Sequence, residues 1–443
     1  MRKVWARYAI VVTLSVLIIG AFFFLIDEND QTVDTGYQIV HAQNFGATGD
    51  GITDDSEAFQ KAIDSVSSSG EVRVPAGIFM IRNVVIKSGI KLIGEGETSV
   101  LKLPADGKVW DMVLITGGDV KAENVTISNL TIDGSADLIG LRDVQMHGID
   151  IQGGSKNVVI RNMNFQNMCG DGIRITEDGK LKTIPQKIDI ENNRFQTIGR
   201  QDIAVVHAYD VTITKNYGTG ALDIEPEKPM IKNVVVTDSS FARLDATSAN
   251  RIQSAEIMVK NSQFEESLLW AIKGIEVDHS TIKHMRISNA SHVTISNNTM
   301  MMLEIFPPSG KSSSNITITN NVIENSSNNR TEAMLGFSDQ QGVGIYMWNT
   351  ADTIVSNNII RAEAAGIYLS SGCEGITIKD NTIERLQGTM SPENGLVAVR
   401  KTKDLTVVNN TFTGWPDSIS VDVSNKDYAK MIANNSFVGS NIQ

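Results

Sequence analysis

The chain has 443 residues, a formal net charge of −12 at pH 7 and only 6% aromatic residues. The acidic balance argues against nucleic acid or an acidic membrane surface as a partner over a broad face. The length would suit two or three ordinary domains, but an internal repeat predicts one long domain instead.

The N-terminal segment contains an uncharged apolar run, Tyr8–Ile26, with Arg2, Lys3 and Arg7 before it. The run is long enough to span a bilayer, and its basic flank predicts a cytoplasmic N-terminus and an extracytoplasmic remainder. No small-residue cleavage site follows directly, so we expect an uncleaved signal anchor. We expect three segments: a cytoplasmic stub with the transmembrane anchor (1–26), a linker (27–43) and a folded domain (44–443). The folded domain is expected to lie at the cell surface.

The folded domain is expected to open with a cap and irregular first coils, residues 44–120. Asp54 and Glu57 resemble a helix-capping pair. The apolar residues after them recur at helical spacing and predict one stripe that covers the open end of the domain, namely Phe59, Ala62, Ile63 and Val66.

The cap also carries a family resemblance. The run FGATGDGITDDSEAF (45–59), followed by VPAG (74–77) and LIGEG (92–96), resembles the start of pectate-lyase-superfamily β-helices of the polygalacturonase and rhamnogalacturonase-like group. The resemblance implies a right-handed parallel β-helix, with this segment as a structural cap. It also implies activity on polysaccharides.

A repeated unit fills the chain after residue 120. The copy SHVTISNNTM (291–300) alternates inward Val and Ile with outward Thr and Ser, which predicts a strand with one buried face. Its two asparagines predict a sharp turn, and stacked copies could form asparagine ladders. Successive copies begin about 22 to 23 residues apart, which suits three short strands and three turns. We therefore expect an all-β solenoid, a right-handed parallel β-helix of about thirteen coils and on the order of 60 Å.

The two cysteines, Cys169 and Cys373, are expected to stay unpaired. Eight or so coils would separate them, on the order of 35 Å, whereas a disulfide requires Cα atoms within about 7 Å.

The residues expected for a polygalacturonase site are mostly missing. The family motifs N-T-D, D-D, G-H-G and R-I-K fall on Gln145–His147, on Asp171 with no second acid, on Arg200–Asp202 and on Asp223–Glu225. The resemblance therefore implies a shared fold with a rebuilt site.

Strand alternation predicts a different site. With Ile149/Ile151, Ile173/Ile175, Ile203/Val205 and Leu222/Ile224 inward, the outer face would collect carboxylates, an arginine and a histidine on adjacent coils. We expect catalytic roles for Asp171, Asp202, His207, Asp223 and Glu225, and substrate-binding roles for Asp150, Arg174 and Arg200. Segments GRQDI (199–203) and DIEP (223–226) also resemble a pair found in secreted β-helix proteins that act on polysaccharides.

Two carboxyl groups, one acid and one base or nucleophile, are what glycosidic hydrolysis requires, so a glycoside hydrolase is the leading hypothesis. A polysaccharide lyase or C5-epimerase is an alternative, with His207 as base and Arg174 or Arg200 neutralising a uronate. Calcium would be a candidate cofactor only for a lyase. A salt-bridge ladder of Asp150, Arg174 and Asp223 is the structural alternative.

An aromatic group further along predicts sugar stacking. Tyr346, Trp348 and Tyr368 are expected to point outward beside one another. They would serve a polysaccharide-active enzyme or a non-catalytic polysaccharide-binding surface protein. No zinc spacing, nucleophile elbow or EF-hand loop is present, so we expect no cofactor and no resident metal.

Overall fold

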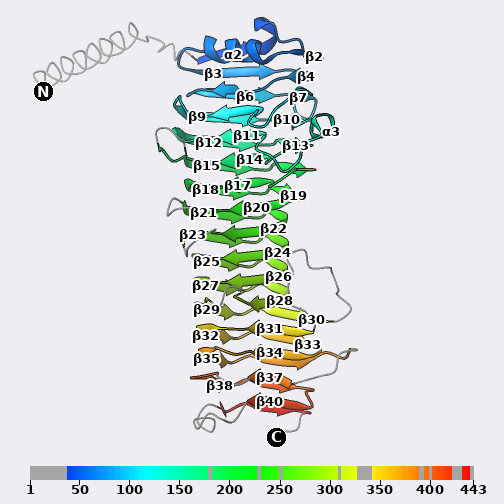
Figure 1. The fold of residues 1–443 in the computed structure, drawn as a ribbon, viewed down its shortest axis with the longest axis vertical. Coiled ribbons are helices and arrows are strands. Elements are labelled where there is room, and N and C mark those ends of the chain that lie inside the picture. The colour runs from blue at the N-terminus through cyan, green and yellow to red at the C-terminus, as the bar shows by residue number, and fades with distance from the viewer. Residues whose placement is uncertain are drawn as a thin grey trace, which may run out of the picture.

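The computed structural model describes the chain in nine stretches (Figure 1), namely 37–177, 182–226, 231–248, 253–307, 311–326, 342–388, 394–398, 402–421 and 432–439. The predicted anchor, residues 1–26, lies outside them. Within these stretches no helix combines the length and apolarity needed to cross a bilayer. The folded part begins earlier than expected, because Tyr37–His41 forms a strand that pairs with Ser69–Val74. Residues 37–43, which the sequence suggested as linker, therefore belong to the rod.

The chain winds into a rod of stacked coils, and every strand pair in it is parallel. One 16-stranded sheet runs the whole length of the rod. Its strands, in order, are β1 (Tyr37–His41), β3 (Ser69–Val74), β6 (Ile90–Gly94), β9 (Ala122–Ser128), β12 (Ser155–Arg161), β15 (Gln186–Glu191), β18 (Ala208–Thr214), β21 (Ile231–Thr237), β23 (Gln253–Lys260), β25 (Ile272–Asp278), β27 (Ser291–Ser296), β29 (Ser313–Thr319), β32 (Thr350–Ser356), β35 (Glu374–Lys379), β38 (Thr406–Val408) and β41 (Ile432–Ala433).

The remaining strands form a second sheet with two series in its N-terminal part. The first series is β2 (Asp50–Asp54), β4 (Gly77–Met80), β7 (Ser99–Lys102), β10 (Thr131–Asp133), β13 (Asn164–Gln166), β16 (Arg194–Gln196) and β19 (Tyr217–Gly218). The second series is β5 (Val84–Ile86), β8 (Leu114–Thr116), β11 (Ile149–Ile151), β14 (Ile173–Ile175), β17 (Ile203–Val205) and β20 (Ala221–Ile224).

Both series join in the middle of the rod, because β19 and β20 pair with the same strand. Four long strands follow, β22 (Ser240–Thr247), β24 (Gln263–Trp270), β26 (Thr281–Ser288) and β28 (Thr299–Ile305). The series then separate again into β30 (Val322–Asn325), β33 (Ile359–Ala362), β36 (Thr382–Arg385), β39 (Thr411–Thr413) and β42 (Ser436–Val438), and into β31 (Val343–Met347), β34 (Ala365–Leu369), β37 (Asn394–Ala398) and β40 (Asp417–Val421). The expectation of three strands per coil is therefore wrong for these four middle coils.

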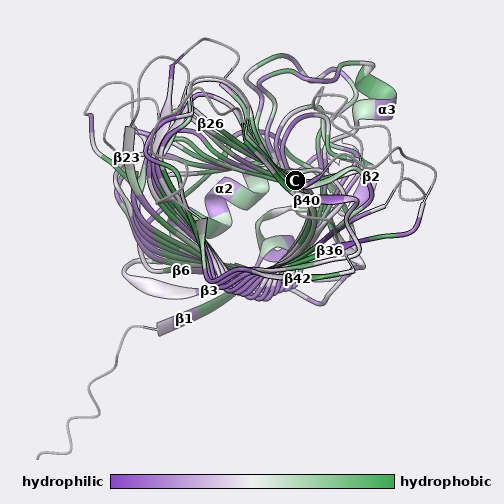
Figure 2. Ribbon diagram, turned by 90° about the horizontal axis from the view of Figure 1, so that it is seen from below, coloured by the Kyte–Doolittle hydropathy of each residue, from purple (hydrophilic) through white to green (hydrophobic). Residues whose placement is uncertain are grey.

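The interior is one continuous apolar stack. Seen along the rod in Figure 2, hydrophobic residues line the inside of the coils. The residues predicted to point inward are all fully buried, namely Ile149, Ile151, Ile173, Ile175, Ile203, Val205, Leu222 and Ile224. This confirms the strand register on which the predicted site depends. The interior also holds both cysteines, which are unpaired as expected.

The turn asparagines form the predicted ladder. In the copy 291–300, Asn297 adopts the left-handed conformation (φ 57°), whereas Asn298 is buried. The backbone N–H of Asn298 donates to Asn321 Oδ1 at 2.9 Å, and that of Asn321 donates to Asn358 Oδ1 at 2.8 Å. The same contact continues through Asn381 and Asn410. The two asparagines of a pair therefore have different roles. The first forms the bend, and the side chain of the second accepts a hydrogen bond from a buried backbone N–H group.

The N-terminal end of the rod is covered by a short 3₁₀ helix, η1 (Ala42–Phe45), and helix α2 (Ser56–Ser65) (Figure 1). The predicted apolar stripe is buried as expected: Phe59, Ala62 and Ile63 lie on α2, and Val66 follows directly after it. The predicted capping pair is wrong: the N-cap residue is Asp55, whose carboxylate instead accepts hydrogen bonds from the backbone N–H groups of Thr48 and Gly49. Glu57 pairs with Lys61 one helical turn later. A third short helix, α3 (Ala136–Ile139), lies in a loop outside the coils.

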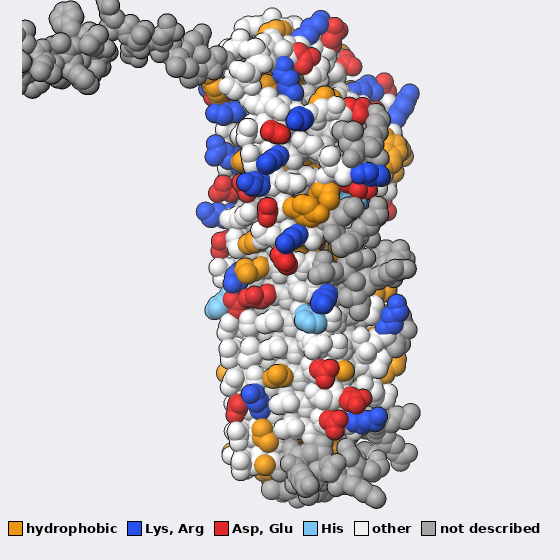
Figure 3. Space-filling view, turned by 90° about the vertical axis from the view of Figure 1, so that its left-hand side faces the viewer, with side chains coloured by type: hydrophobic (Ala, Val, Ile, Leu, Met, Phe, Trp, Pro, Cys, Tyr) orange, Lys and Arg blue, Asp and Glu red, His pale blue; other side chains and the backbone are white. Residues whose placement is uncertain are grey.

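The face on the side of the 16-stranded sheet carries basic and acidic side chains interspersed over its N-terminal half (Figure 3). The C-terminal half is mostly uncharged there. This face therefore has no extended electrostatic potential of a single sign that would attract a charged polymer.

Candidate functional site

One outward row of side chains, here named the central column, runs along the second sheet. Each member is the Cα partner of the next in adjacent strands: Ile115, Asp150, Arg174, Ala204, Asp223, Asp245, Leu268, Arg286, Glu304, Tyr346, Tyr368, Val397 and Ser420. Successive rungs of a parallel sheet lie about 4.8 Å apart. The predicted acid site and the predicted aromatic group therefore share one row of one face.

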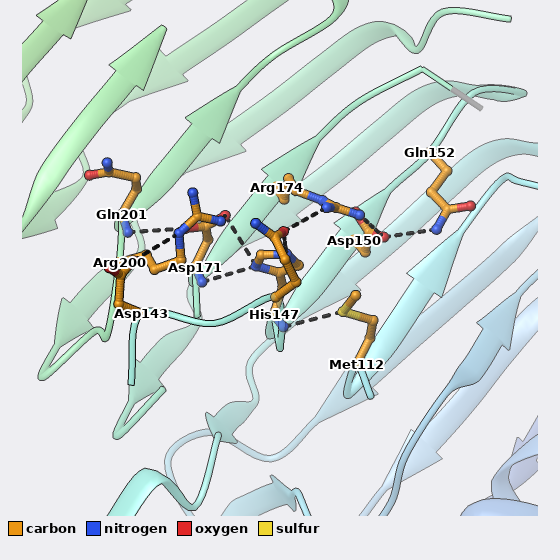
Figure 4. Close-up of polar contacts among 10 residues, drawn as sticks. Met112, Asp143, His147, Asp150, Gln152, Asp171, Arg174, Arg200 and Gln201 are labelled. Atoms are coloured by element: carbon orange, nitrogen blue, oxygen red, sulfur yellow. Dashed lines mark hydrogen bonds and ion pairs between the residues drawn. The ribbon is translucent and has the colours of Figure 1, made fainter. Parts of the chain in front are cut away.

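Asp150 and Arg174 form a closed pair at one end of this row (Figure 4). Arg174 Nε and Nη2 donate to the two carboxylate oxygens of Asp150 at 2.9 and 2.8 Å. Arg174 Nη1 donates to Gln145 Oε1 at 3.0 Å, and the guanidinium lies 5.6 Å from the ring centroid of Trp110. Asp150 is fully buried. The Asp150–Arg174 part of the salt-bridge alternative is thus present, and both groups already have strong protein partners.

A second polar network continues from Gln145 through His147 to Asp171 (Figure 4). The backbone N–H of Asp171 donates to His147 Nδ1 at 3.0 Å, and Nδ1 also lies 3.1 Å from Asp171 Oδ2. The other ring nitrogen, Nε2, lies 2.9 Å from Gln145 Oε1. Asp171 Oδ1 accepts a hydrogen bond from the backbone N–H of Gln201 at 3.1 Å, and Oδ2 lies 3.6 Å from Arg200 Nη1. His147 and Asp171 are almost completely buried. The fixed carboxylate of Asp171 therefore gives the guanidinium of Arg200 a rigid partner.

Asp202 does not lie on the outer face. It is fully buried, and its Oδ2 accepts a hydrogen bond from the backbone N–H of Gly220 at 2.8 Å. A side chain at Gly218 would occupy the place of this carboxylate and would also touch Phe241 of the core. In the coil before, a Cβ at Gly172 would meet the buried ring of Phe195. This position of the coil faces inward, so the expectation of an outward Asp202 is wrong.

Burial raises the pKa of Asp202 to about 7, and the hydrogen bond from Gly220 lowers it only in part. Its Oδ1 has no hydrogen-bond partner among the described residues. A carboxyl group in this position is out of reach of a polymer on the outer surface.

Asp223 stands at the centre of a group of charges. Its pKa is raised to about 8, mainly by burial and also by the negative charges of Glu225, Asp245 and Asp171, while the positive charge of Arg200 lowers it in part. Only 9% of Asp223 is exposed. Arg174, by contrast, is two rungs away beyond Ala204 and is held by Asp150. Asp223 therefore does not join the salt-bridge ladder, and it carries a proton at neutral pH.

The other predicted site residues differ in how close they lie to this group. Glu225, two residues after Asp223, is partly exposed. Arg200 is about a quarter exposed and also contacts the exposed Asp143 at 3.3 Å. His207 is 4% exposed, with Nδ1 3.3 Å from Thr176 Oγ1. The structure thus brings Asp171, Arg200, Asp223 and Glu225 together, joined by Asp245, which the sequence analysis overlooked.

The aromatic residues lie side by side as expected. The rings of Tyr346 and Tyr368 stack at 5.7 Å, and Phe306 packs against Trp348 at 4.9 Å. Tyr346 is 7% exposed and belongs to a small apolar cluster outside the main core. Trp348 and Tyr368 are half-buried, so they offer more aromatic surface to a sugar than Tyr346.

Metal ligands do not gather in the part of the chain that the structure describes: no three His, Cys, Asp or Glu side chains there could hold an ion together.

Several known proteins are similar to parts of this chain. The mannuronan C5-epimerase AlgE3 of Azotobacter vinelandii is 30% identical over 189 residues, covering 39% of this chain and 10% of that protein. The pre-neck appendage protein of Bacillus phage phi29 is 30% identical over 205 residues, covering 40% and 22%. Alginate lyase 7 of Azotobacter vinelandii is 35% identical over 112 residues, covering 22% and 13%. The matches thus span about a tenth to a fifth of these relatives.

A solved structure shares the fold. The phage phi29 gene product 12 superposes with a TM-score of 0.66 and 19% identity, covering 92% of this chain and 59% of that one. Residues 258–441 also match the family described as right handed beta helix region, which agrees with the expected handedness.

Residues 39–266, which include the Asp223 group, match the family described as rhamnogalacturonase A/epimerase, pectate lyase-like. This match covers more than half of the chain and agrees with the resemblance seen in the cap. The chain belongs to the rhamnogalacturonase A/epimerase family of pectate lyase-like β-helix proteins.

Proposed function

We propose that this protein is a polysaccharide-active enzyme that hydrolyses glycosidic bonds at the group formed by Asp171, Arg200, Asp223, Glu225 and Asp245. The observation that carries the proposal is the buried Asp223, whose pKa of about 8 keeps it protonated at neutral pH among other carboxylates. Hydrolysis requires such a protonated carboxyl group to give its proton to the leaving oxygen, and an ionised partner to act at the anomeric carbon.

The partner carboxylate has two candidates. Glu225 follows directly after the end of β20, two residues from Asp223, which corresponds to about 6.6 Å in Cα position for an extended chain. Asp245 is one rung away. Asp171 is held by His147, Gln201 and Arg200, which suits a positioning residue better than a reacting one. Asp202 faces the core and has no part in the proposal.

A second candidate function is β-elimination or C5-epimerisation of uronic acids. The specific observation in its favour is Arg200, a partly exposed cation close enough to lower the pKa of Asp223. Such a cation could neutralise a substrate carboxylate while a base removes the neighbouring proton. The similarity to a C5-epimerase and an alginate lyase supports this reading. Arg174 is the weaker choice for this role because Asp150 already binds it on two sides.

The deciding experiment uses the soluble part, started before Tyr37 so that β1 is kept. It is offered a panel of polymannuronate, polyguluronate, polygalacturonate, rhamnogalacturonan and neutral galactan. Hydrolysis predicts new reducing ends without ultraviolet absorbance. A lyase would give unsaturated, absorbing products from uronates only, and an epimerase would change the composition without cleavage. Binding without any product would favour a non-catalytic surface protein and would refute the proposal.

The role of Asp223 is tested with Asp223→Asn on whichever polymer is degraded. We expect turnover to fall by about 100-fold or more, since general acids contribute ~10² to 10⁴. The melting temperature should hold or rise, because the variant removes an uncompensated buried carboxyl group. Asp189→Asn, an exposed aspartate on the 16-stranded sheet, is the matched control and should change neither property. Full activity of Asp223→Asn would discard Asp223 as the acid.

We also propose that residues 8–26 anchor the protein in a membrane, with the rod on the extracytoplasmic side. The support is the uncharged apolar run and its basic flank. Full-length protein should stay in the membrane fraction after salt and carbonate washing. A mature N-terminus at or after Ile26 in the native host would refute the anchor.

A further inference from the structure

Trp110 presents its indole ring at the surface beside the predicted site. It lies in the loop between β7 and β8, and 59% of the residue is exposed. Exposure alone does not make a site, because single apolar residues are common on protein surfaces. Two further observations set Trp110 apart, namely its backbone conformation and the side chain beneath its ring.

The backbone of Trp110 has a conformation that bulky residues rarely adopt. Its φ is 77°, in the left-handed region, where an indole-bearing residue is strained. The chain on either side is fixed: the N–H of Trp110 donates to the Gln145 carbonyl oxygen at 2.7 Å. The carboxylate of Asp111 accepts hydrogen bonds from the backbone N–H of Lys108 at 2.9 Å and from Asn83 Nδ2 at 3.0 Å. Strained residues of this kind persist where their surroundings impose them, and they are concentrated at functional sites.

The ring lies over the ion pair of Asp150 and Arg174. The Arg174 guanidinium is 5.6 Å from the ring centroid, a distance at which a cation is attracted to an aromatic face. Gln145 contacts both groups, because its side chain accepts from Arg174 and its carbonyl oxygen accepts from Trp110. The indole is therefore held on one side by a fixed cation. Since more than half of the residue is exposed, the ring surface turned away from Arg174 is open to a ligand.

The chemistry of this surface fits the C–H face of a sugar ring. An aromatic side chain offers a large, rigid apolar area, and a pyranose carries a row of C–H groups on one of its faces. Arg174 directs Nε, Nη1 and Nη2 to acceptors of the protein, and Asp150 balances its charge. A ligand on Trp110 therefore needs no charged group of its own.

The position of Trp110 suits a polymer that also reaches the Asp223 group. Arg174 is the Cα partner of Ala204, and Ala204 is that of Asp223. The strands that carry Arg174 and Asp223 are thus two rungs apart, about 10 Å. One polysaccharide chain can place one sugar on Trp110 and another near Asp223.

We propose that Trp110 is a substrate-positioning residue that stacks on a pyranose ring of the polysaccharide, in a subsite separate from the Asp223 group. The subsite recognises the shape of the sugar ring and accepts neutral and acidic sugars alike. This inference rests on the proposed activity on polysaccharides, but not on the choice between hydrolysis, elimination and epimerisation. Because the contact is the same before and during the reaction, it contributes to affinity and not to turnover.

The first test measures binding without turnover. The full-length chain in mild detergent is run through native gels that contain, in turn, each polymer of the panel. At least one polymer should retard the wild type, and Trp110→Ala should raise its Kd about tenfold, which corresponds to ~1.4 kcal/mol. Trp110→Tyr keeps an aromatic ring and should lose far less. Val109→Ala, a neighbour that is 45% exposed, is the matched control and should bind as the wild type does.

The outcomes of this test separate the subsite from the enzyme activity. No retardation of the wild type by any polymer, or equal retardation of folded Trp110→Ala, would overturn the subsite. Retardation that depends on Trp110, without product from any polymer, would refute the enzyme activity and leave the subsite standing.

The second test excludes a merely structural role. On the polymer that the wild type degrades, Trp110→Ala should raise KM about tenfold and leave kcat unchanged. The ratio to wild type should be the same at low and high salt, because no charged contact with the sugar is lost. A fall in kcat with an unchanged KM, or an effect that disappears at high salt, would mean that Trp110 acts through Arg174 and would overturn the proposal.

Discussion

Replacing Asp202 by asparagine should stabilise the rod at neutral and alkaline pH. The folded protein holds this carboxyl group at a pKa of about 7, against an ordinary value of 3.8, because it is buried beside Phe241 with a single backbone hydrogen bond. Each pKa unit corresponds to about 1.36 kcal/mol, so ionised Asp202 destabilises the fold by on the order of 4 kcal/mol.

The sign of the pH dependence follows from the raised pKa. The folded state binds the proton more tightly than the unfolded state, so the penalty is absent below about pH 4, grows as the pH rises towards 7 and is constant above it. Asparagine has nearly the same shape as protonated aspartate and does not titrate. The difference in free energy of unfolding between Asp202→Asn and wild type should therefore be small at pH 4 and reach several kcal/mol at pH 8.

Urea unfolding of the soluble part, followed by circular dichroism at several pH values, measures this difference. Asp150→Asn is the contrasting variant: it should be destabilising by about 3 to 5 kcal/mol at neutral pH, because it leaves the guanidinium of Arg174 without its buried partner. An Asp202→Asn protein no more stable than wild type at pH 8 would refute the account of Asp202 as an uncompensated carboxyl group in the core.

Other predictions follow from the same structure. Ile295→Asp should cost several kcal/mol in unfolding free energy because it buries an unpaired charge, whereas Thr294→Asp should cost little; the reverse order in urea unfolding would reject the strand register. Asn321→Leu should cost about 1 to 3 kcal/mol, because it leaves the Asn298 backbone N–H in the ladder without an acceptor, and an unchanged unfolding midpoint would contradict this. If Asp223 is the acid, kcat/KM should fall as the pH rises through about 8, and a profile flat from pH 6 to 9 would exclude that role.

The sequence predicts the cap and the strand register well, but it undercounts the coils. About thirteen were expected, whereas the long sheet has 16 strands. The coils of the cap lack the asparagine repeat, so their strands cannot be recognised by self-similarity. The sequence likewise does not show that two short strands merge into one long strand in each of the four middle coils. The alternation of inward and outward residues continues through one long strand and through two short strands alike.

The candidate site was predictable in part. Asp223, Glu225 and Arg200 could be grouped because strand alternation and the coil period place them on adjacent rungs. The same reasoning could have found Asp245, because one coil of 22 residues separates it from Asp223 and it follows the inward Leu244 as Asp223 follows Leu222. Strand alternation could not predict the contacts among Gln145, His147 and Asp171. Gln145 and His147 precede strand β11, so the loop determines where their side chains lie.

The sequence by itself determined the architecture, because short-range alternation and a repeated turn fix which side chains enter the interior of a solenoid. Only the tertiary structure decided which outward charges are already paired. Asp150 and Arg174 face one another across one rung, Asp223 and Arg174 are separated by Ala204, and Asp202 turns inward at a corner where glycines make room. Whether a carboxyl group is ionised, and whether a polymer at the surface can contact it, depend on its burial and on partners from other coils. Neither the burial nor these partners can be seen in the sequence of a single strand.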